Sequence, residues 1–364
     1  MEERKIKIGI TQGDVNGVGY EIILKTFADP TMLEICTPVV YGSPKVAAYH
    51  RKALDLPTNF SIVHSASEAG HGRLNVVNCS DEEIKVEFGK ADPEVGKAAL
   101  AALERATTEY REGQIDAIVT APINKRVVHS DETAFPGQTE FIEERLGDGR
   151  KSLMILIKDD LRVALATTHI PVSEIAPAIT KELITGKIAT FGQCLKQDFG
   201  IDSPRIAVLA LNPHAGDDGL LGTEERDIIA PAIIEMRKKG LICYGPYAAD
   251  DFMGSGNYTH FDGILAMYHD QGMIPFKTLA MEDGVIFTAG LPVTRTSPTR
   301  GAAYDIAGKG VADEASFRQA IYVAIDVACN RRREKAAHAN PLRKQYYEKR
   351  DDSDKLKLDA VDDE

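Results

Sequence analysis

The chain has 364 residues, of which 43% are hydrophobic and 27% charged, and its formal net charge at pH 7 is −12. This length predicts about two domains or one large α/β unit, with a core that needs no disulfide support. Because the sequence has no clustered Lys/Arg stripe, the negative charge argues against a nucleic-acid partner, and an anionic substrate must meet local cations.

Scattered cysteines and the lack of a long apolar segment predict a cytoplasmic protein. The five cysteines are odd in number and have no C-x-x-C spacing, which is typical of reduced intracellular proteins. The N-terminal residues lead directly into a strand-like segment without the apolar region of a signal peptide, and no apolar run approaches membrane-spanning length. Residues 350–364 are rich in Asp and poor in large apolar side chains, so we expect an acidic, disordered tail there.

The first predicted elements are a strand at residues 6–10 and a helix at residues 20–27. The glycine-rich turn TQGDVNGVG joins them. Such a turn before a helix can cradle an anion. Its spacing is not G-x-G-x-x-G, however, so ordinary turn chemistry is the favoured interpretation.

Strands and helices then alternate along the chain. Asp92-Pro93-Glu94 is typical of a helix start, with an N-cap acid and a proline at the first helical position, and we expect this helix to end near residue 113. Gly272 is expected to form a turn after a strand. Further strands are predicted at residues 39–42, 74–77, 115–120, 161–167, 205–211, 241–244, in the first half of 262–277 and at 285–291. Two further helices are predicted: one begins after a cap at residue 223 and ends at residue 240, and the other covers residues 316–333. This alternation predicts a mainly parallel sheet with helices on both faces.

Three of the nine histidines each follow directly on a predicted strand: His169, His214 and His269. A lone histidine at a strand end is more often structural. If neighbouring parallel strands deliver all three to one rim of the sheet, they form a three-imidazole site with an open position, as in catalytic zinc sites. Asp270 and Asp250 could orient such ligands or exchange protons, although a structural role explains either one alone better.

Cations also follow strand ends. Lys277, Arg295 and Arg300 come after the third histidine, and Lys125 follows an earlier strand. They could bind a phosphate and a carboxylate, for which arginine offers bidentate geometry, although any one of them alone is more simply a solvated side chain. The sequence lacks a P-loop, an H-E-x-x-H and a G-x-S-x-G, which argues against Walker-type nucleotide hydrolysis, zincin chemistry and serine hydrolysis.

Six motifs follow one another along the chain: TAPINK (120–125), FPGQTE (135–140), TTHIP (167–171), LNPHAG (211–216), AMYHDQG (266–272) and GLPVTRTS (290–297). In this order they resemble the 4-hydroxythreonine-4-phosphate dehydrogenase family of pyridoxal phosphate biosynthesis. The resemblance spans nearly the whole chain. It implies a fold like the isocitrate and isopropylmalate dehydrogenases, with two subdomains and a cleft between them: residues 1–140 with 292–349, and residues 141–291, which carry the histidines.

The resemblance also implies a site shared between the subunits of a homodimer. The three histidines would hold a divalent metal, for which zinc is the first candidate and magnesium or cobalt the alternatives. NAD or NADP would be the cofactor, and the resemblance assigns no residues to its binding. Proton transfer would fall to Asp270, Lys277 and Asp250. The substrate would contact the side chains at five positions: Gln138, Thr139, Lys277, Ile286 and Arg295.

The implied reaction is the oxidation of 4-phosphohydroxy-L-threonine with decarboxylation to 3-amino-2-oxopropyl phosphate. Three positions depart from the family pattern: Gln138 replaces a histidine, Ile286 an asparagine, and Arg300 the histidine of a His-Gly pair. Three alternatives therefore stay open. The chain could act on another phosphorylated four-carbon hydroxy acid, it could be a metal-bound dimer with weak or lost turnover that serves a binding role, or it could be a zinc hydrolase.

Overall fold

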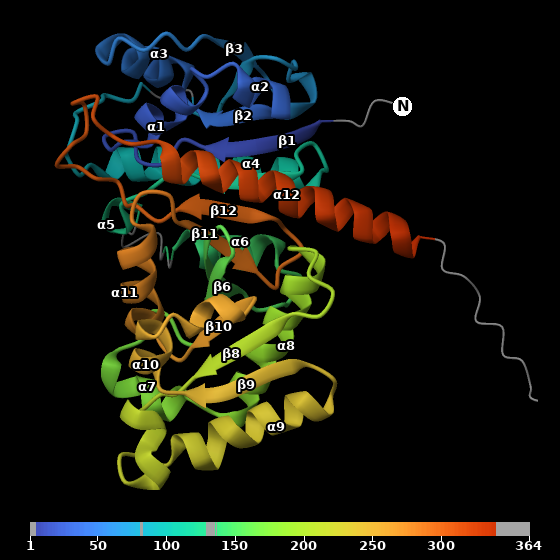
Figure 1. Ribbon diagram of the computed structural model, residues 1–364. Coiled ribbons are helices and arrows are strands. Elements are labelled where there is room, and N and C mark those ends of the chain that lie inside the picture. The colour runs from blue at the N-terminus through green and yellow to red at the C-terminus, as the bar shows by residue number, and fades with distance from the viewer. Residues whose placement is uncertain (1–4, 81–82, 129–134, 136, 340–364) are drawn as a thin grey trace, which may run out of the picture.

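The computed structural model describes residues 5–80, 83–128, 135 and 137–339, which form an α/β body around one extended sheet (Figure 1). The tail expected at residues 350–364 lies outside the described residues. Among the described helices, none combines the length and the apolar composition that crossing a membrane requires.

The sheet contains twelve described strands. In chain order they are β1 (Ile6–Thr11), β2 (Cys36–Gly42), β3 (Phe60–Val63), β4 (Leu74–Asn78), β5 (Ala117–Thr120), β6 (Leu153–Lys158), β7 (Leu161–Leu165), β8 (Arg205–Leu209), β9 (Ile242–Tyr247), β10 (Gly263–Ala266), β11 (Val285–Ala289) and β12 (Arg295–Pro298). Their order across the sheet is β3-β4-β2-β1-β5-β12-β11-β6-β7-β10-β8-β9. The antiparallel pairings β12–β11, β11–β6 and β6–β7 lie at the centre, and the described pairings on either side are parallel. The predicted, mainly parallel sheet is confirmed, with a reversal of strand direction at its middle.

Helices cover both faces of this sheet, as predicted. They are α1 (Gly19–Thr26), α2 (Thr31–Ile35), α3 (Pro44–Ala53), α4 (Pro93–Arg111), α5 (Lys125–Val128), α6 (Gln138–Leu146), α7 (Val172–Ala178), α8 (Lys181–Gln197), α9 (Ala230–Lys238), α10 (Ala249–Gly254), α11 (His269–Ala280) and α12 (Ala315–His338). On one face, α1, α8, α9 and α12 share a single apolar cluster with the strands. On the other face there are two clusters, one under α4 and α6 and one under α10 and α11. Figure 1 shows α12 crossing in front of β12.

The sequence placed most of these elements within a few residues of their ends. The Asp92 carboxylate accepts a hydrogen bond from the Glu94 backbone N–H at 3.0 Å, and so caps α4 as expected. The helix predicted after residue 223 begins as a π-helical turn, Glu225–Ile229, before α9. Strands β6 and β12 and helices α3 and α8 were among the elements that were not predicted. Because β6 and β7 are joined by only two residues, Asp159 and Asp160, they form a tight hairpin that the pattern of separate strands obscures.

The expected turn at Gly272 was wrong. Gly272 lies inside α11, a helix that begins directly at His269. A Cβ atom on Gly272 would lie 2.4 Å from Leu165 Cδ2 and 3.1 Å from Val163 Cγ1, so the glycine lets the helix approach β7 closely. The same helix therefore carries His269 and presses its backbone against the strand that precedes His169.

Packing also explains the glycine-rich turn after β1. A Cβ on Gly13 would lie 2.4 Å from the Pro122 carbonyl oxygen, and one on Gly17 would lie 2.6 Å from the Ala302 carbonyl oxygen. Gly13 also has a φ of +68°, which favours glycine. These contacts support the interpretation of the turn as structural.

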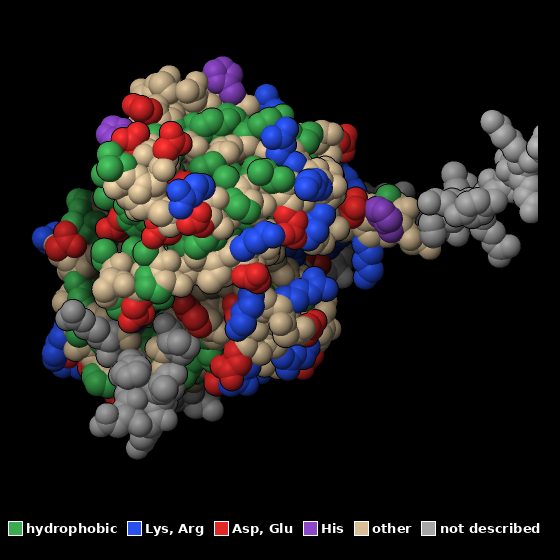
Figure 2. Space-filling view, turned by 90° about the horizontal axis from the view of Figure 1, so that it is seen from below, with side chains coloured by type: hydrophobic (Ala, Val, Ile, Leu, Met, Phe, Trp, Pro, Cys, Tyr) green, Lys and Arg blue, Asp and Glu red, His purple; other side chains and the backbone are tan. Residues whose placement is uncertain are grey.

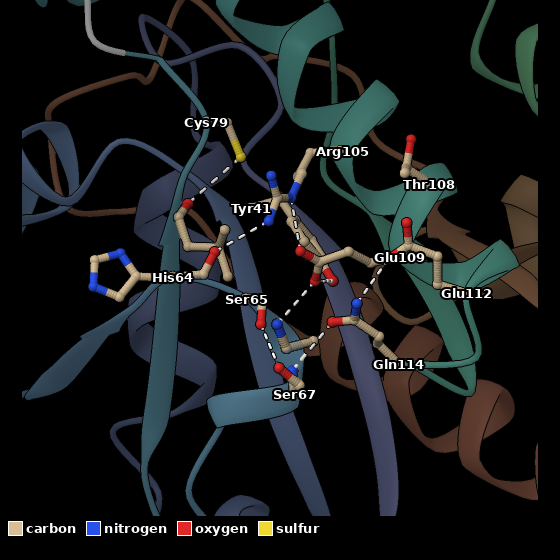
Figure 3. A network of polar contacts seen from close by, with 12 residues as sticks. Tyr41, His64, Ser65, Ser67, Cys79, Arg105, Thr108, Glu109, Glu112 and Gln114 are labelled. Atoms are coloured by element: carbon tan, nitrogen blue, oxygen red, sulfur yellow. Dashed lines mark hydrogen bonds and ion pairs between the residues drawn. The ribbon is translucent and has the colours of Figure 1, made fainter.

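A buried carboxylate ties the first strands to α4 (Figure 3). Glu109 is 1% exposed, and its Oε2 accepts hydrogen bonds from the Tyr41 hydroxyl at 2.7 Å and the Ala66 backbone N–H at 2.9 Å. Its Oε1 accepts a 2.7 Å hydrogen bond from Arg105 Nε. Burial, followed by the Glu109 charge, raises the pKa of Tyr41. The network gives this carboxylate a charged partner and two further donors, which buried charges require.

His50 makes the folded state sensitive to acid. The side chain is fully buried, its Nε2 lies 2.8 Å from the Val15 carbonyl oxygen, and its Nδ1 has no partner among the described residues. Burial lowers its pKa to about 4, against a weaker opposing effect of the Val15 hydrogen bond. The unfolded chain therefore takes up a proton first, near pH 6.5, and stability is lost as the pH falls from there towards 4.

We expect the free energy of unfolding to fall by about 2 kcal/mol between pH 7 and pH 5 through this one group. Denaturant unfolding of His50→Gln at both pH values measures it, because glutamine can still donate to Val15 but cannot titrate. The variant should lose about 2 kcal/mol less than the wild type over this interval. Equal losses in the two proteins would show that His50 does not couple stability to pH.

Candidate active site

A cavity of about 230 Å³ lies over the central strands β5, β12, β11 and β6. It occupies the gap between the two apolar clusters that α4 with α6 and α10 with α11 form on the same face of the sheet. The residues that line it are Thr120, Ala121, Pro122, Ile123, Lys125, Gln138, Thr139, Glu140, Met154, His169, Ile286, Arg295, Ser297, Pro298, Thr299, Arg300 and Gly301. The site is therefore on the face of the sheet, where its two halves meet.

Arg295 is the central charged side chain of the cavity. It is only 4% exposed, and its guanidinium donates hydrogen bonds to the hydroxyl oxygens of three threonines: Thr120 (2.6 Å), Thr288 (3.1 Å) and Thr139 (3.2 Å). Its Nε is buried and has no partner among the described residues. Burial lowers the pKa of Arg295 to about 10, although the nearby Glu140 charge opposes this. A buried guanidinium held by neutral oxygens, with a donor left over, is suited to recruit an anion.

Three of the other four substrate positions that the resemblance implied lie around the same cavity as Arg295. Gln138 and Thr139 begin α6, and the Gln138 amide nitrogen donates to the Ala121 carbonyl oxygen at 3.3 Å. Ile286 lies in β11, paired with Ser297 of β12, and presents an apolar wall to the cavity. The structure thus brings Gln138, Thr139, Ile286 and Arg295 together around one cavity, as the resemblance implied.

Two of the three candidate metal ligands lie side by side. Strands β7 and β10 are parallel neighbours, so His169 and His269 follow them at the same rim, with ring centroids 6.0 Å apart. His169 also lines the cavity, and its Nδ1 lies 3.5 Å from Glu140 Oε1. His269 Nδ1 lies 2.7 Å from Asp270 Oδ1. Each imidazole therefore has a carboxylate beside one ring nitrogen, an arrangement that orients metal-binding histidines.

The Glu140 carboxylate links the imidazole to the cationic side of the cavity. Burial alone would raise the pKa of Glu140, but the hydrogen bond from His169 and the charge of Lys125 lower it overall. Glu140 therefore stays ionised, with His169 on one side and the cations Lys125 and Arg295 on the other.

His214 is not joined to this pair. It follows β8, the strand next to β10, in a turn where residues 214–218 all have φ between +45° and +81°. The Glu225 carboxylate anchors the start of this turn by accepting hydrogen bonds from the backbone N–H groups of Leu211 (2.8 Å) and Asn212 (2.7 Å). His214 is exposed. In the part of the chain that the structure describes, no three His, Cys, Asp or Glu side chains are grouped so that they could hold a metal.

The candidate proton-transfer residues are more dispersed. Asp270 lies beside His269, and Lys277 is seven residues further along α11, on the same side of the helix because seven residues make about two turns. Lys277 is half-buried and is not among the residues that line the cavity. Asp250 is exposed in α10 and lines a separate cavity with Tyr247 and Ser255. The structure therefore brings Asp270, but not Asp250 or Lys277, to the histidine pair.

The sequence did not single out four polar residues that shape the site. Thr120 and Thr288 hold Arg295, Glu140 pairs with His169, and Glu225 anchors the turn that carries His214. Thr120 and Glu140 lie inside two of the six motifs, so the sequence could have indicated that they belong to the site. Nothing local marks Thr288 or Glu225, because their roles depend on contacts across strands and loops.

The fold and the site together define a class: an α/β enzyme with a cationic cavity for a small anionic substrate, next to a pair of imidazoles. The family model described as "Pyridoxal phosphate biosynthetic protein PdxA" matches residues 34–324. The chain belongs to this family.

Known members and structures resemble the chain over most of its length. It is 76% identical over 364 residues, covering 100% of both chains, to the 4-hydroxythreonine-4-phosphate dehydrogenase of Bacteroides thetaiotaomicron. It is 39% identical over 328 residues, 89% of this chain and 98% of the relative, to the D-threonate 4-phosphate dehydrogenase of Cupriavidus necator. The crystal structure of 4-hydroxythreonine-4-phosphate dehydrogenase from Klebsiella pneumoniae superposes with a TM-score of 0.79 at 34% identity, covering 90% of this chain and 99% of that one.

Proposed function

We propose that this chain catalyses the metal-dependent, NAD(P)-linked oxidation of 4-phosphohydroxy-L-threonine, with decarboxylation to 3-amino-2-oxopropyl phosphate, in the cytoplasm. The observation that carries the proposal is the buried Arg295, which the described residues leave without a carboxylate partner, in a cavity that also reaches His169. The name of the Bacteroides relative, which is similar over the whole chain, supports the same reaction. The dehydrogenase activity of the family requires a nicotinamide cofactor, to which we assign no residues.

The histidine pair fits a divalent metal. Two imidazoles that share a tetrahedral ion through Nε2 place their ring centroids about 5 Å apart, close to the 6.0 Å observed. Glu140 and Asp270 occupy the Nδ1 side of His169 and His269, which leaves each Nε2 for the ion. Zinc suits imidazole ligands best, with magnesium or cobalt as alternatives. When bound, the metal supplies a Lewis acid that lowers the pKa of the substrate hydroxyl.

The chain's own residues provide binding and proton transfer. Arg295 binds one anionic end of the substrate. The three threonine hydroxyls fix the plane of its guanidinium, so its side chain loses little conformational entropy on binding. Asp270 keeps the His269 ring oriented and is the proposed acceptor of the hydroxyl proton. Lys277, on the same side of α11, is the proposed donor of a proton to the product.

A second copy of the chain completes the proposed metal site. His214 is exposed and is not grouped with the other two histidines among the described residues, so we propose that it serves the site of a partner subunit. Exposed apolar side chains lie on α7, along and just after α11, and after the turn that carries His214, and such a partner could cover them: Val172, Leu220, Ile274, Leu279 and Met281. We also propose that the described parts of residues 1–140 with 292–349, and residues 141–291, form two subdomains that meet at the cavity; residues 340–349 lie outside the described residues.

D-threonate 4-phosphate is the second candidate substrate. Ile286 offers no hydrogen bond to the substrate, and Glu140 is the single described carboxylate in the cavity lining. The Gln138 amide nitrogen donates to Ala121, which leaves the neutral Oε1 of Gln138 as an acceptor. The site therefore offers few partners for the ammonium group that distinguishes 4-phosphohydroxy-L-threonine from a hydroxy acid. The threonate relative named above supports this candidate.

Steady-state kinetics with both substrates, zinc and NAD or NADP decides between them. We expect kcat/KM for 4-phosphohydroxy-L-threonine to exceed that for D-threonate 4-phosphate. The reverse ratio would assign the chain to the second substrate. If neither substrate reduces the cofactor, a binding role replaces the proposed activity.

A further inference from the structure

Arg300 is a second guanidinium in the same cavity, and its environment differs from that of Arg295. It follows β12 and is half-buried, and its Nε is buried without a partner among the described residues. No hydrogen bond or ion pair with another described residue holds its side chain. The preceding residue shares this property, because the Thr299 hydroxyl is also buried, lines the cavity and has no partner among the described residues.

The charges of the cavity are unbalanced. Among the described residues of the lining, Lys125, Arg295 and Arg300 carry three positive charges and Glu140 carries the single negative charge, an excess of two positive charges. The whole chain carries a net charge of −12, and the surface in Figure 2 mixes side chains of both signs. A local positive excess on an acidic protein needs a counter-charge, and a phosphate dianion supplies two negative charges and several acceptor oxygens.

The two arginines differ in how their guanidinium groups are held. Three hydroxyls fix Arg295 in place, whereas no described residue supports Arg300 in this way, so its donors are available to a ligand. Arginine's planar fork matches phosphate oxygens two at a time, and an adjacent hydroxyl adds a third donor. A merely solvated Arg300 would expose its Nε to water, which the structure excludes.

We propose that Arg300, together with the Thr299 hydroxyl, binds the phosphate group of the substrate and makes this chain selective for phosphorylated over unphosphorylated hydroxy acids. The substrate in this statement rests on the proposed function, but the phosphate site does not. Arg300 is thus a specificity-determining residue, and Arg295 is left to bind the other anionic end.

Inorganic phosphate tests the site without turnover. Isothermal titration calorimetry of the full chain with phosphate should give a dissociation constant at least tenfold higher for Arg300→Gln than for the wild type. Arg300→Lys, which keeps the charge without the fork, should fall between them, and Thr299→Val should show a smaller loss. Arg226→Gln is the matched control, because Arg226 is exposed and paired with Asp227 outside the cavity, and it should bind phosphate like the wild type.

The kinetic signature should agree. Arg300→Gln should raise KM for the phosphorylated substrate at least tenfold with kcat changed less than threefold, whereas a structural role would lower kcat and the melting temperature together. Unchanged phosphate affinity in Arg300→Gln, or no phosphate binding by the wild type, would overturn the proposal. Arg300-dependent phosphate binding without turnover of either substrate would uphold it and reject the proposed function instead.

Discussion

Arg295→Met is expected to lower kcat/KM for the phosphorylated substrate roughly a thousandfold, equivalent to about 4 kcal/mol of transition-state stabilisation. The reason is that Arg295 is buried, already oriented by three hydroxyls, and holds a donor in reserve for an anion. Methionine keeps much of the side-chain volume but none of the charge. Arg295→Lys restores the charge without the fork and should lose less activity, about tenfold to a hundredfold.

The Arg295→Met substitution should not destabilise the folded protein, although it lowers activity. Burying a guanidinium that has no carboxylate partner among the described residues destabilises the folded state, so the free energy of unfolding of Arg295→Met should be equal to or higher than that of the wild type. Denaturant unfolding and steady-state kinetics on the same preparation give both quantities. A variant that keeps kcat/KM within threefold of the wild type would remove Arg295 from the binding site, and a large loss of stability would make its role structural.

Mixing inactive histidine variants should restore activity. We expect His214→Ala and His269→Ala each to lose activity, because each removes a ligand of the proposed metal. If His214 comes from the partner subunit, a mixed dimer of the two contains one intact site, and random pairing should recover about one quarter of the wild-type activity. The measurement is cofactor reduction after the two proteins are unfolded together and refolded.

The adjacent pair supplies the control. His169 and His269 have ring centroids 6.0 Å apart within one chain, so a mixed dimer of His169→Ala and His269→Ala contains no intact site. That mixture should stay inactive. Recovery in the control, or none in the first mixture, would contradict a site built from the His169–His269 pair of one subunit and His214 of the other.

The sequence predicted the residues of the candidate site better than their arrangement. Strand-length apolar runs predicted where His169 and His269 lie, and the parallel pairing of β7 and β10 confirms that both reach one rim. Arg295, however, stands at the start of β12, and it contributes to the same site because the sheet reverses direction at β11 and β6. Strand order and direction are set by contacts between distant segments, which local patterns do not contain.

Glycines and hydroxyls were the least predictable features. Gly272 has the local signature of a turn but serves a close contact between α11 and β7, which depends on tertiary packing. Thr288 was unremarkable in the sequence because its role, holding Arg295, arises only when β11 and β12 pair. The resemblance supplied Gln138, Thr139 and Ile286 as neighbours, and the cavity joins them to two residues that it did not assign, Glu140 and Thr120.

The most direct test of the proposed activity is the rate at which NAD or NADP is reduced when metal-free protein is given 4-phosphohydroxy-L-threonine, measured before and after zinc is added. We expect no reduction of the cofactor in the presence of a chelator, and reduction with release of one carbon dioxide per turnover once zinc is restored. Reduction at the same rate in the chelator, or none with zinc, magnesium or cobalt, would contradict the proposed activity.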